Sequence, residues 1–131
     1  SDVCSSDLFR SMLQGTLYRI QQLSGSPAEK KEQFRSLYLS EKHRDSPELG
    51  CPIPAFLFET SKKSPQFRQR FSEVLEASLT ERAELLGIPK EKEDQLLAEF
   101  CQWIGAQMLA RATKNSPFSN RVLESCRGQK T

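Results

Sequence analysis

The fold is decided by a long helical pattern in residues 93–113, which read EDQLLAEFCQWIGAQMLARAT. Apolar side chains recur there every three or four positions, which is the spacing of one face of an α-helix. That face holds Leu97, Phe100, Cys101, Ile104 and Met108. The pattern predicts an amphipathic helix from about Glu93 to Thr113 that packs on the rest of the chain through this face.

Serine-proline pairs mark the starts of three further helices. Serine caps a helix N-terminus, and proline suits the first turn because its missing N–H would have no partner there. The pairs are Ser26-Pro27, Ser64-Pro65 and Ser116-Pro117. A glutamate three residues after Ser26 completes a predicted capping box. We expect the last two of these helices to end near Leu86-Gly87 and at Arg127, before Gly128.

Two of the predicted helices carry a clear apolar stripe. The stripe of a first helix, which ends near Ser24-Gly25, holds Phe9, Leu13, Leu17, Ile20 and Leu23. The stripe of the helix opened by Ser64-Pro65 holds Phe67, Phe71, Val74, Leu75, Ser78 and Arg82. Both spacings predict one buried face for each helix.

The middle of the chain is irregular and then strongly apolar. Residues 40–50 contain turn-forming residues and predict a loop or a single helical turn. A short segment, Ala55-Phe56-Leu57-Phe58, follows; it is apolar on all sides and predicted to be buried. Only seven residues are Val or Ile, so strands are not expected. The predicted fold class is all-α, an antiparallel helical bundle of about six helices.

Composition excludes several classes of protein. A chain of 131 residues suits one domain, and 27% charged residues are too many for a membrane-spanning protein. Basic and acidic residues are mixed and give a net charge of +2, so no face is built to follow nucleic-acid phosphates. Of the four cysteines, Cys4 lies within residues 1–8, which we predict below to be non-native. The other three, Cys51, Cys101 and Cys126, lie far apart without a histidine cluster, which predicts a reduced cytoplasmic protein with no metal and no cofactor.

Residues 1–8, which read SDVCSSDL, resemble the translation of one frame of a sequencing adapter more than natural protein. We therefore predict that residues 1–8 are non-native and that the domain spans residues 9–131. On this interpretation the natural protein begins upstream and its N-terminal part is missing.

Small residues form a row on the 93–113 helix, at Ala98, Cys101, Gly105 and Ala112. Small side chains let another backbone come close. The row fits either tight packing inside one chain or a homodimer in which this helix and the last one pack on their symmetry mates. The sequence alone does not separate these two interpretations.

Aromatic residues gather in the middle of the chain, where they could fill the core or wall a pocket for a small apolar ligand. For any single aromatic residue, core packing is the commoner role. The polar groups that could orient a ligand are His43, Glu59, Gln102 and Gln107. His43 beside Cys51 also suggests a thiol enzyme, but nothing marks an oxyanion hole or a nucleophile turn, and we predict no enzymatic activity.

Residues 38–59, which read YLSEKHRDSPELGCPIPAFLFE, resemble the C-terminal domain of TetR/AcrR-family transcriptional regulators. Residues 103–112, WIGAQMLARA, and 119–124, SNRVLE, are similar to the last two helices of that family. Residues 8–13 resemble the start of the helix that follows the family's helix-turn-helix domain. The DNA-contacting helices themselves have no counterpart in this chain.

The resemblance implies the effector-sensing and homodimerisation domain of a bacterial one-component regulator, typically a repressor that a small molecule releases from DNA. DNA would be bound only through the missing N-terminal domain, and the effector would be small and apolar. The candidate pocket residues are Tyr38, Phe56, Glu59, Phe71, Phe100, Trp103 and Gln107. The candidate dimer residues are Ala98, Cys101, Gly105, Ala112, Phe118 and Val122.

The alternative is a helical adaptor that binds a partner protein through an exposed apolar groove and needs no small molecule. A symmetric dimer with an enclosed cavity would favour the regulator, whereas a monomer with an open groove would favour the adaptor.

Overall fold

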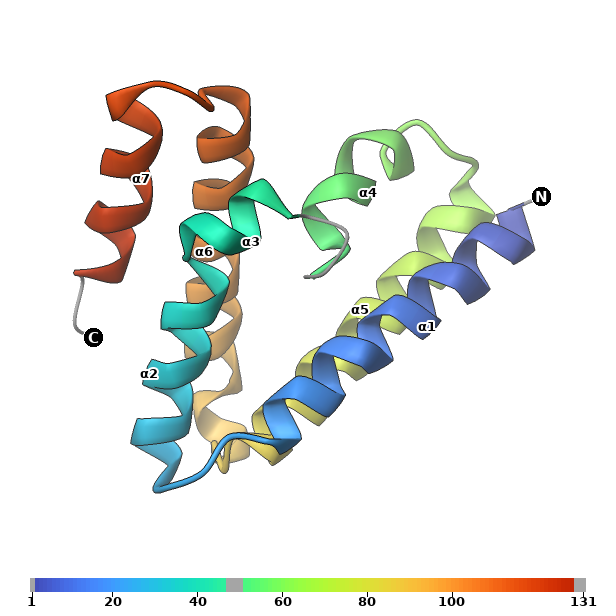
Figure 1. Ribbon diagram of the computed structural model, residues 1–131. Coiled ribbons are helices and arrows are strands. Elements are labelled where there is room, and N and C mark those ends of the chain that lie inside the picture. The colour runs from blue at the N-terminus through green and yellow to red at the C-terminus, as the bar shows by residue number, and fades with distance from the viewer. Residues whose placement is uncertain (1, 47–50, 129–131) are drawn as a thin grey trace.

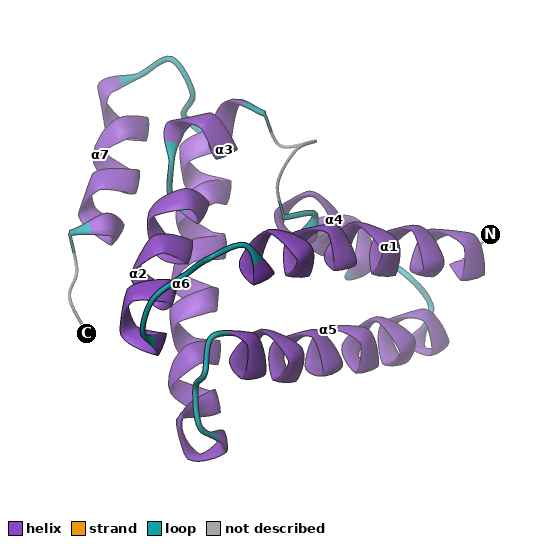
Figure 2. Ribbon diagram, turned by 60° about the horizontal axis from the view of Figure 1, so that its bottom comes forward, coloured by secondary structure: helices purple, strands orange, loops and turns teal. Residues whose placement is uncertain are grey.

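The computed structural model describes residues 2–46 and 51–128, and for residues 2–9 and Met12 the backbone alone. The described residues form helices and loops, with no strand among them (Figures 1 and 2). The helices are α1 (Asp2–Gln21), α2 (Pro27–Tyr38), α3 (Glu41–Asp45), α4 (Ile53–Thr60), α5 (Pro65–Leu85), η2 (Lys90–Lys92), α6 (Glu93–Ala112) and α7 (Pro117–Arg127). The all-α fold class is confirmed.

The long helices form two groups that meet at one end and diverge at the other (Figure 1). In the first group, α1 and α5 lie side by side and run in the same direction (Figures 1 and 2). In the second group, α6 and α7 pack as an antiparallel pair, with α2 alongside α6. The short helices α3 and α4 lie at the open end, where α3 packs on α6.

The buried side chains form two clusters, and the larger one reaches from the second group to Ile20 of α1 and Ala83 of α5. The larger cluster surrounds Trp103, which is 1% exposed, and includes Leu39, Leu86 and Leu123. The smaller cluster lies between α1 and α5 and contains Leu13, Phe67, Phe71 and Val74. The predicted stripe of α5 is confirmed, because five of its six residues are buried and Leu75 is half-buried.

Local signals place the helix boundaries correctly. Ser26, Ser64 and Ser116 each accept a backbone N–H from the first turn of α2, α5 and α7. The capping box is present, since the Glu29 side chain in turn accepts the Ser26 N–H. Residues 41–45 form the single short helix α3, while residues 47–50 lie outside the described part of the chain.

The predicted packing face of α6 is only partly right: Phe100 and Ile104 are half-buried and pack against the larger core cluster, but the other three residues do not. Leu97 and Met108 are 46% and 39% exposed, and Cys101 is also exposed. The buried face is instead made by Leu96, Glu99, Trp103, Ala106, Gln107 and Ala110. This helix is apolar around most of its circumference, so hydrophobic periodicity does not single out the side that faces the core.

The expectation that residues 55–58 are buried on every side is also wrong. Phe58 is 65% exposed and Ala55 is exposed, while Phe56 and Leu57 are half-buried. Helix α4 packs on α5 and α6 with part of its circumference, so its other side faces solvent. There the Lys62 ammonium lies 4.1 Å from the centre of the Phe58 ring.

Two further observations bear on the sequence predictions. None of the helices within residues 2–46 and 51–128 is both long enough and apolar enough to cross a membrane. Residues 2–8 continue helix α1, and their non-native origin stays a prediction.

Two glycines give a matched test of this backbone. Gly87 has φ +70°, and a Cβ there would lie 2.9 Å from a Pro27 side-chain atom. We expect Gly87→Ala to destabilise the protein by at least about 1–2 kcal/mol, the cost of a left-handed alanine. Gly15→Ala should stabilise it by about 0.5–1 kcal/mol, because Gly15 lies inside α1 and, apart from its own helix backbone, no atom of the described side chains lies within 4 Å of its Cβ position. Urea unfolding followed by circular dichroism measures the stability of both variants. Equal stabilities of the two variants would contradict the left-handed backbone at Gly87.

Candidate functional site

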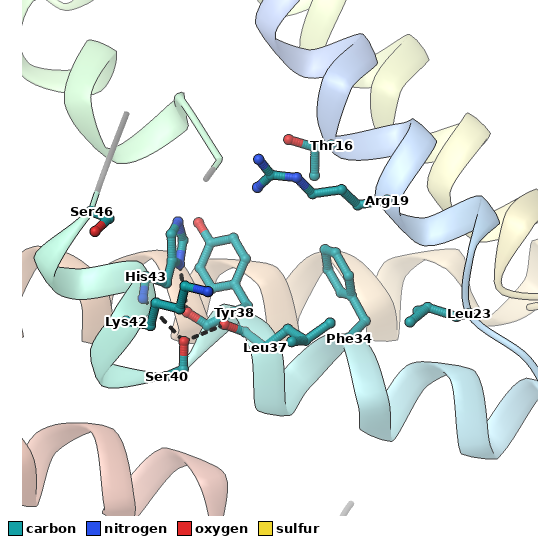
Figure 3. Close-up of a pocket in the computed structure, with 10 residues that line it drawn as sticks. All are labelled: Thr16, Arg19, Leu23, Phe34, Leu37, Tyr38, Ser40, Lys42, His43 and Ser46. Carbon is teal, nitrogen blue, oxygen red and sulfur yellow. Dashed lines mark hydrogen bonds between the residues drawn. The ribbon is translucent and has the colours of Figure 1, made fainter. Parts of the chain in front are cut away.

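A cavity of about 280 Å³ lies between α1 on one side and α2 and α3 on the other (Figure 3). Among the described residues it is lined by Thr16, Arg19, Leu23, Phe34, Leu37, Tyr38, Ser40, Lys42, His43 and Ser46. The lining combines an apolar floor with a few polar and cationic side chains, which is the usual make-up of a small-molecule site.

The wall of the cavity is built where α2 ends. The last carbonyl groups of a helix have no partner within it and need donors from elsewhere. Gln107 of α6 is fully buried, and its Nε2 donates to the carbonyl oxygens of Tyr38 at 2.7 Å and Ser40 at 3.2 Å. Arg127 of α7 donates to the Leu39 carbonyl at 3.0 Å. These bonds fix the position of Tyr38 against α6 and α7.

Helix α3 is fixed in the same way. The Arg111 guanidinium donates to the His43 carbonyl oxygen at 3.0 Å. The Arg44 guanidinium donates to Ser119 and Asn120 of α7 at 3.0 and 2.6 Å, and pairs with Asp45 at 2.9 Å. The wall formed by α2 and α3 is therefore held by side chains of α6 and α7.

His43 connects Tyr38 at the end of α2 with Cys51 at the start of the next described segment. Its Nδ1 lies 2.6 Å from the Tyr38 carbonyl oxygen, and its Nε2 accepts the Cys51 backbone N–H at 3.1 Å. The carbonyl oxygen can only accept, so Nδ1 carries a proton. Because Nε2 accepts a hydrogen bond it carries none, and the imidazole is neutral. Burial lowers the pKa of His43, and the positive charges of Arg111 and Arg19 lower it further, against the raising effect of the Tyr38 bond.

Behind the Tyr38 ring lies a buried cation. Arg82 of α5 is 3% exposed, and its Nη2 has no hydrogen-bond partner among the described residues. Burial lowers the pKa of the Arg82 guanidinium, while nearby Cys51, Tyr38 and Glu81 oppose that shift. Burial also raises the pKa of the Tyr38 phenol well above its usual value, helped by the adjacent Cys51 thiol. A void of about 20 Å³ beside Arg82 has room for about one water molecule.

The seven predicted pocket residues fall in three places. Tyr38 lines the cavity, and the Phe34 ring joins it to Phe100 and Trp103, with ring centres 5.9 and 5.8 Å from that of Phe34. Gln107 lies behind the wall and does not line the cavity. The other three lie away from it: Phe71 and Phe56 in the cluster between α1 and α5, and Glu59 exposed, 3.9 Å from Lys62.

Sequence reasoning did not select Arg19, Thr16 or Lys42, and the sequence offers no signal for them, because nothing in it tells which turns of α1 and α3 face each other. Phe34 and Leu37 had a weak signal, since they share a face of α2 with Tyr38.

The predicted dimer residues lie at the surface. Ala98, Cys101 and Ala112 of α6 are exposed, and no atom lies within 4 Å of the Gly105 Cβ position. On α7, Phe118 is 49% exposed and Val122 is half-buried. The small residues of α6 thus leave space that the described residues do not fill, beside the exposed side chains of Leu97, Met108 and Leu109.

Comparison with known proteins leaves the family open: no protein-family model matches this chain, and no curated protein matches it. Within residues 2–46 and 51–128, no three His, Cys, Asp or Glu side chains gather in a way that could hold a metal ion. Function is therefore inferred from the cavity and the exposed faces.

His43 makes the stability of this wall depend on pH. Because the folded protein lowers the pKa of His43 below its ordinary 6.5, the unfolded chain takes up the proton first. The free energy of unfolding should be fully developed above pH 6.5 and should decrease as the pH falls through that value towards the lower pKa of the folded state.

Urea titrations at several pH values measure this effect. His43→Gln is the informative variant because His43 is the only histidine in the chain. The variant should be less stable at neutral pH but should lack the loss of stability between neutral and mildly acidic pH. The same pH slope in both proteins would contradict the assignment of the neutral imidazole.

Proposed function

We propose that this chain is the effector-sensing and homodimerisation domain of a bacterial one-component transcriptional regulator of the TetR/AcrR type. A small molecule would occupy the cavity between α1 and the α2–α3 wall, and its binding would release the regulator from DNA.

The observation that carries the proposal is the role of the residues that resemble this family. His43, Arg44 and Cys51 belong to the stretch that carries the resemblance; His43 lines the cavity, and bonds of Arg44 and Cys51 hold its wall in place. His43 ties the Tyr38 carbonyl to the Cys51 backbone, and Arg44 holds α3 on α7. A motif that shapes a cavity supports ligand binding more than catalysis, because no nucleophile is presented there with a base and an oxyanion site.

The exposed face of α6 supports association of two copies. Leu97, Met108 and Leu109 place large apolar side chains in water, and Gly105 adds a shallow gap between them. Contiguous apolar surface on a helix commonly marks an interaction site. A two-fold dimer buries the same surface on both copies, so one helix face covers the other.

The arrangement of the helices also supports coupling between the two roles. Helix α1 supplies Thr16 and Arg19 to one side of the cavity, while the α6–α7 pair holds the other side. A ligand that binds better to one separation of these walls shifts the chain towards that separation. By linkage, anything that favours the other separation weakens ligand binding equally.

The solution mass of the full chain tests the association. Light scattering should give a dimer for the natural sequence, and Gly105→Arg should convert it to a folded monomer, because a long charged side chain blocks the gap on α6. Gly15→Arg is the matched control, since Gly15 is equally open but lies on α1. That variant should remain dimeric.

A natural chain that is monomeric at all concentrations would contradict the dimer. The adaptor alternative would then be favoured, because the same exposed face of α6 would remain available for a helix of another protein.

A further inference from the structure

Cations face the cavity from both sides. Figure 3 shows the Arg19 guanidinium extending from α1 towards the side of the cavity that carries Tyr38, and Lys42 on that side beside His43. No acidic side chain is among the described residues that line the cavity. The two acids of α3 lie outside the lining: Glu41 is exposed, and Asp45 is bound to Arg44 and lies 3.7 Å from Lys114.

A third cation lies behind the wall. The Arg82 guanidinium is buried against Tyr38 and Cys51, and the described residues offer its Nη2 no acceptor. A buried guanidinium leaves positive potential in the surrounding low-dielectric region, which the nearby Glu81 carboxylate offsets in part. Burial is the main cause that lowers the pKa of His43, and the positive charges of Arg111 and Arg19 lower it further.

The rest of the lining is apolar. Leu23, Phe34 and Leu37 form the floor, and the Tyr38 ring completes it. A cleft that joins apolar walls to charges of one sign concentrates ligands of the opposite sign. A volume of about 280 Å³ has room for at least about nine non-hydrogen atoms, if each takes at most the ~30 Å³ of a water molecule in the liquid.

We propose that the cavity binds a small amphipathic anion, with an apolar body against Leu23, Phe34 and Leu37 and a single carboxylate-type head between Arg19 and Lys42. The inference rests on the proposed function and replaces the sequence-based expectation of an apolar effector with an anionic one. Aliphatic and aromatic carboxylates share this chemistry.

Three eight-carbon probes separate charge from apolar contact: octanoate, octanol and octylammonium. Calorimetry on the full chain at neutral pH and low salt should show octanoate binding at least about tenfold more tightly than octanol, the equivalent of one charge-assisted hydrogen bond. Octylammonium should bind more weakly than octanol. Added salt should weaken octanoate binding while leaving octanol binding unchanged.

Variants locate the site. Arg19→Gln and Lys42→Gln should each reduce the affinity for octanoate by about tenfold and leave the affinity for octanol unchanged. Lys90→Gln is the matched control, because Lys90 is an exposed lysine on η2, outside the cavity lining. Leu37→Glu, at a residue that is 60% exposed, should reverse the preference so that octylammonium binds more tightly than octanoate.

The outcomes distinguish this inference from the proposed function. Equal binding of octanol and octanoate would overturn the anionic ligand but leave an effector cavity. Octanoate affinity unchanged in Arg19→Gln and Lys42→Gln would also overturn it, because the anion would bind elsewhere. Failure of all three probes to bind would overturn it as well, whereas the proposed dimer is judged separately from the mass of Gly105→Arg.

Discussion

The carbonyl groups at the end of α2 impose the constraint on which the other features depend. A helix that stops inside a protein must find donors for its last carbonyls, and leaving them unpaired costs more than most packing contacts contribute. Here the donors are side chains of three other helices: Gln107, Arg127 and His43. Gln107 therefore has a structural role that its chemistry alone does not suggest. It sets the place where α2 ends, and with it the position of Tyr38 and of the whole cavity wall.

The helix boundaries could be predicted because their signals are local. Serine and proline at Ser64-Pro65 act on the backbone of their own turn, so neighbouring residues suffice to read them. The orientation of α6 could not be predicted, because it depends on which partners the helix meets. Leu97 and Met108 form a face as apolar as the one around Trp103, and only the arrangement of α2 and α7 decides between them. For the same reason the sequence did not decide whether the row of small residues on α6 serves internal packing or association of two chains. The structure places this row at the surface.

The site was predictable to the extent that it lies in one continuous segment. Tyr38 and His43 are close in sequence and stay close in space, so the aromatic and turn pattern found them. Arg19 lies on α1, which is separated from His43 in the sequence by the whole of α2, and no sequence pattern links the two residues. Arg82 is a different case, because its position on the apolar stripe of α5 correctly predicted that it is buried. Burying a cation is costly, so a cation at such a position indicates a functional role.

Helix α1 contributes to the cavity near its C-terminal end and extends well beyond it. Thr16 and Arg19 lie in the last turns of this twenty-residue helix, and the opposite end lies away from the α2–α6–α7 group (Figure 1). At 1.5 Å per residue, residues 9–21 of this helix, which exclude the predicted non-native segment, span about 20 Å, so tilting them by about 5° at the cavity end carries the other end about 1.7 Å. Because α5 lies along α1 in the same direction, the pair can tilt as one stiff arm without unravelling either helix. A sub-ångström shift of α1 at the cavity is therefore enlarged at its far end by the length of the helix alone.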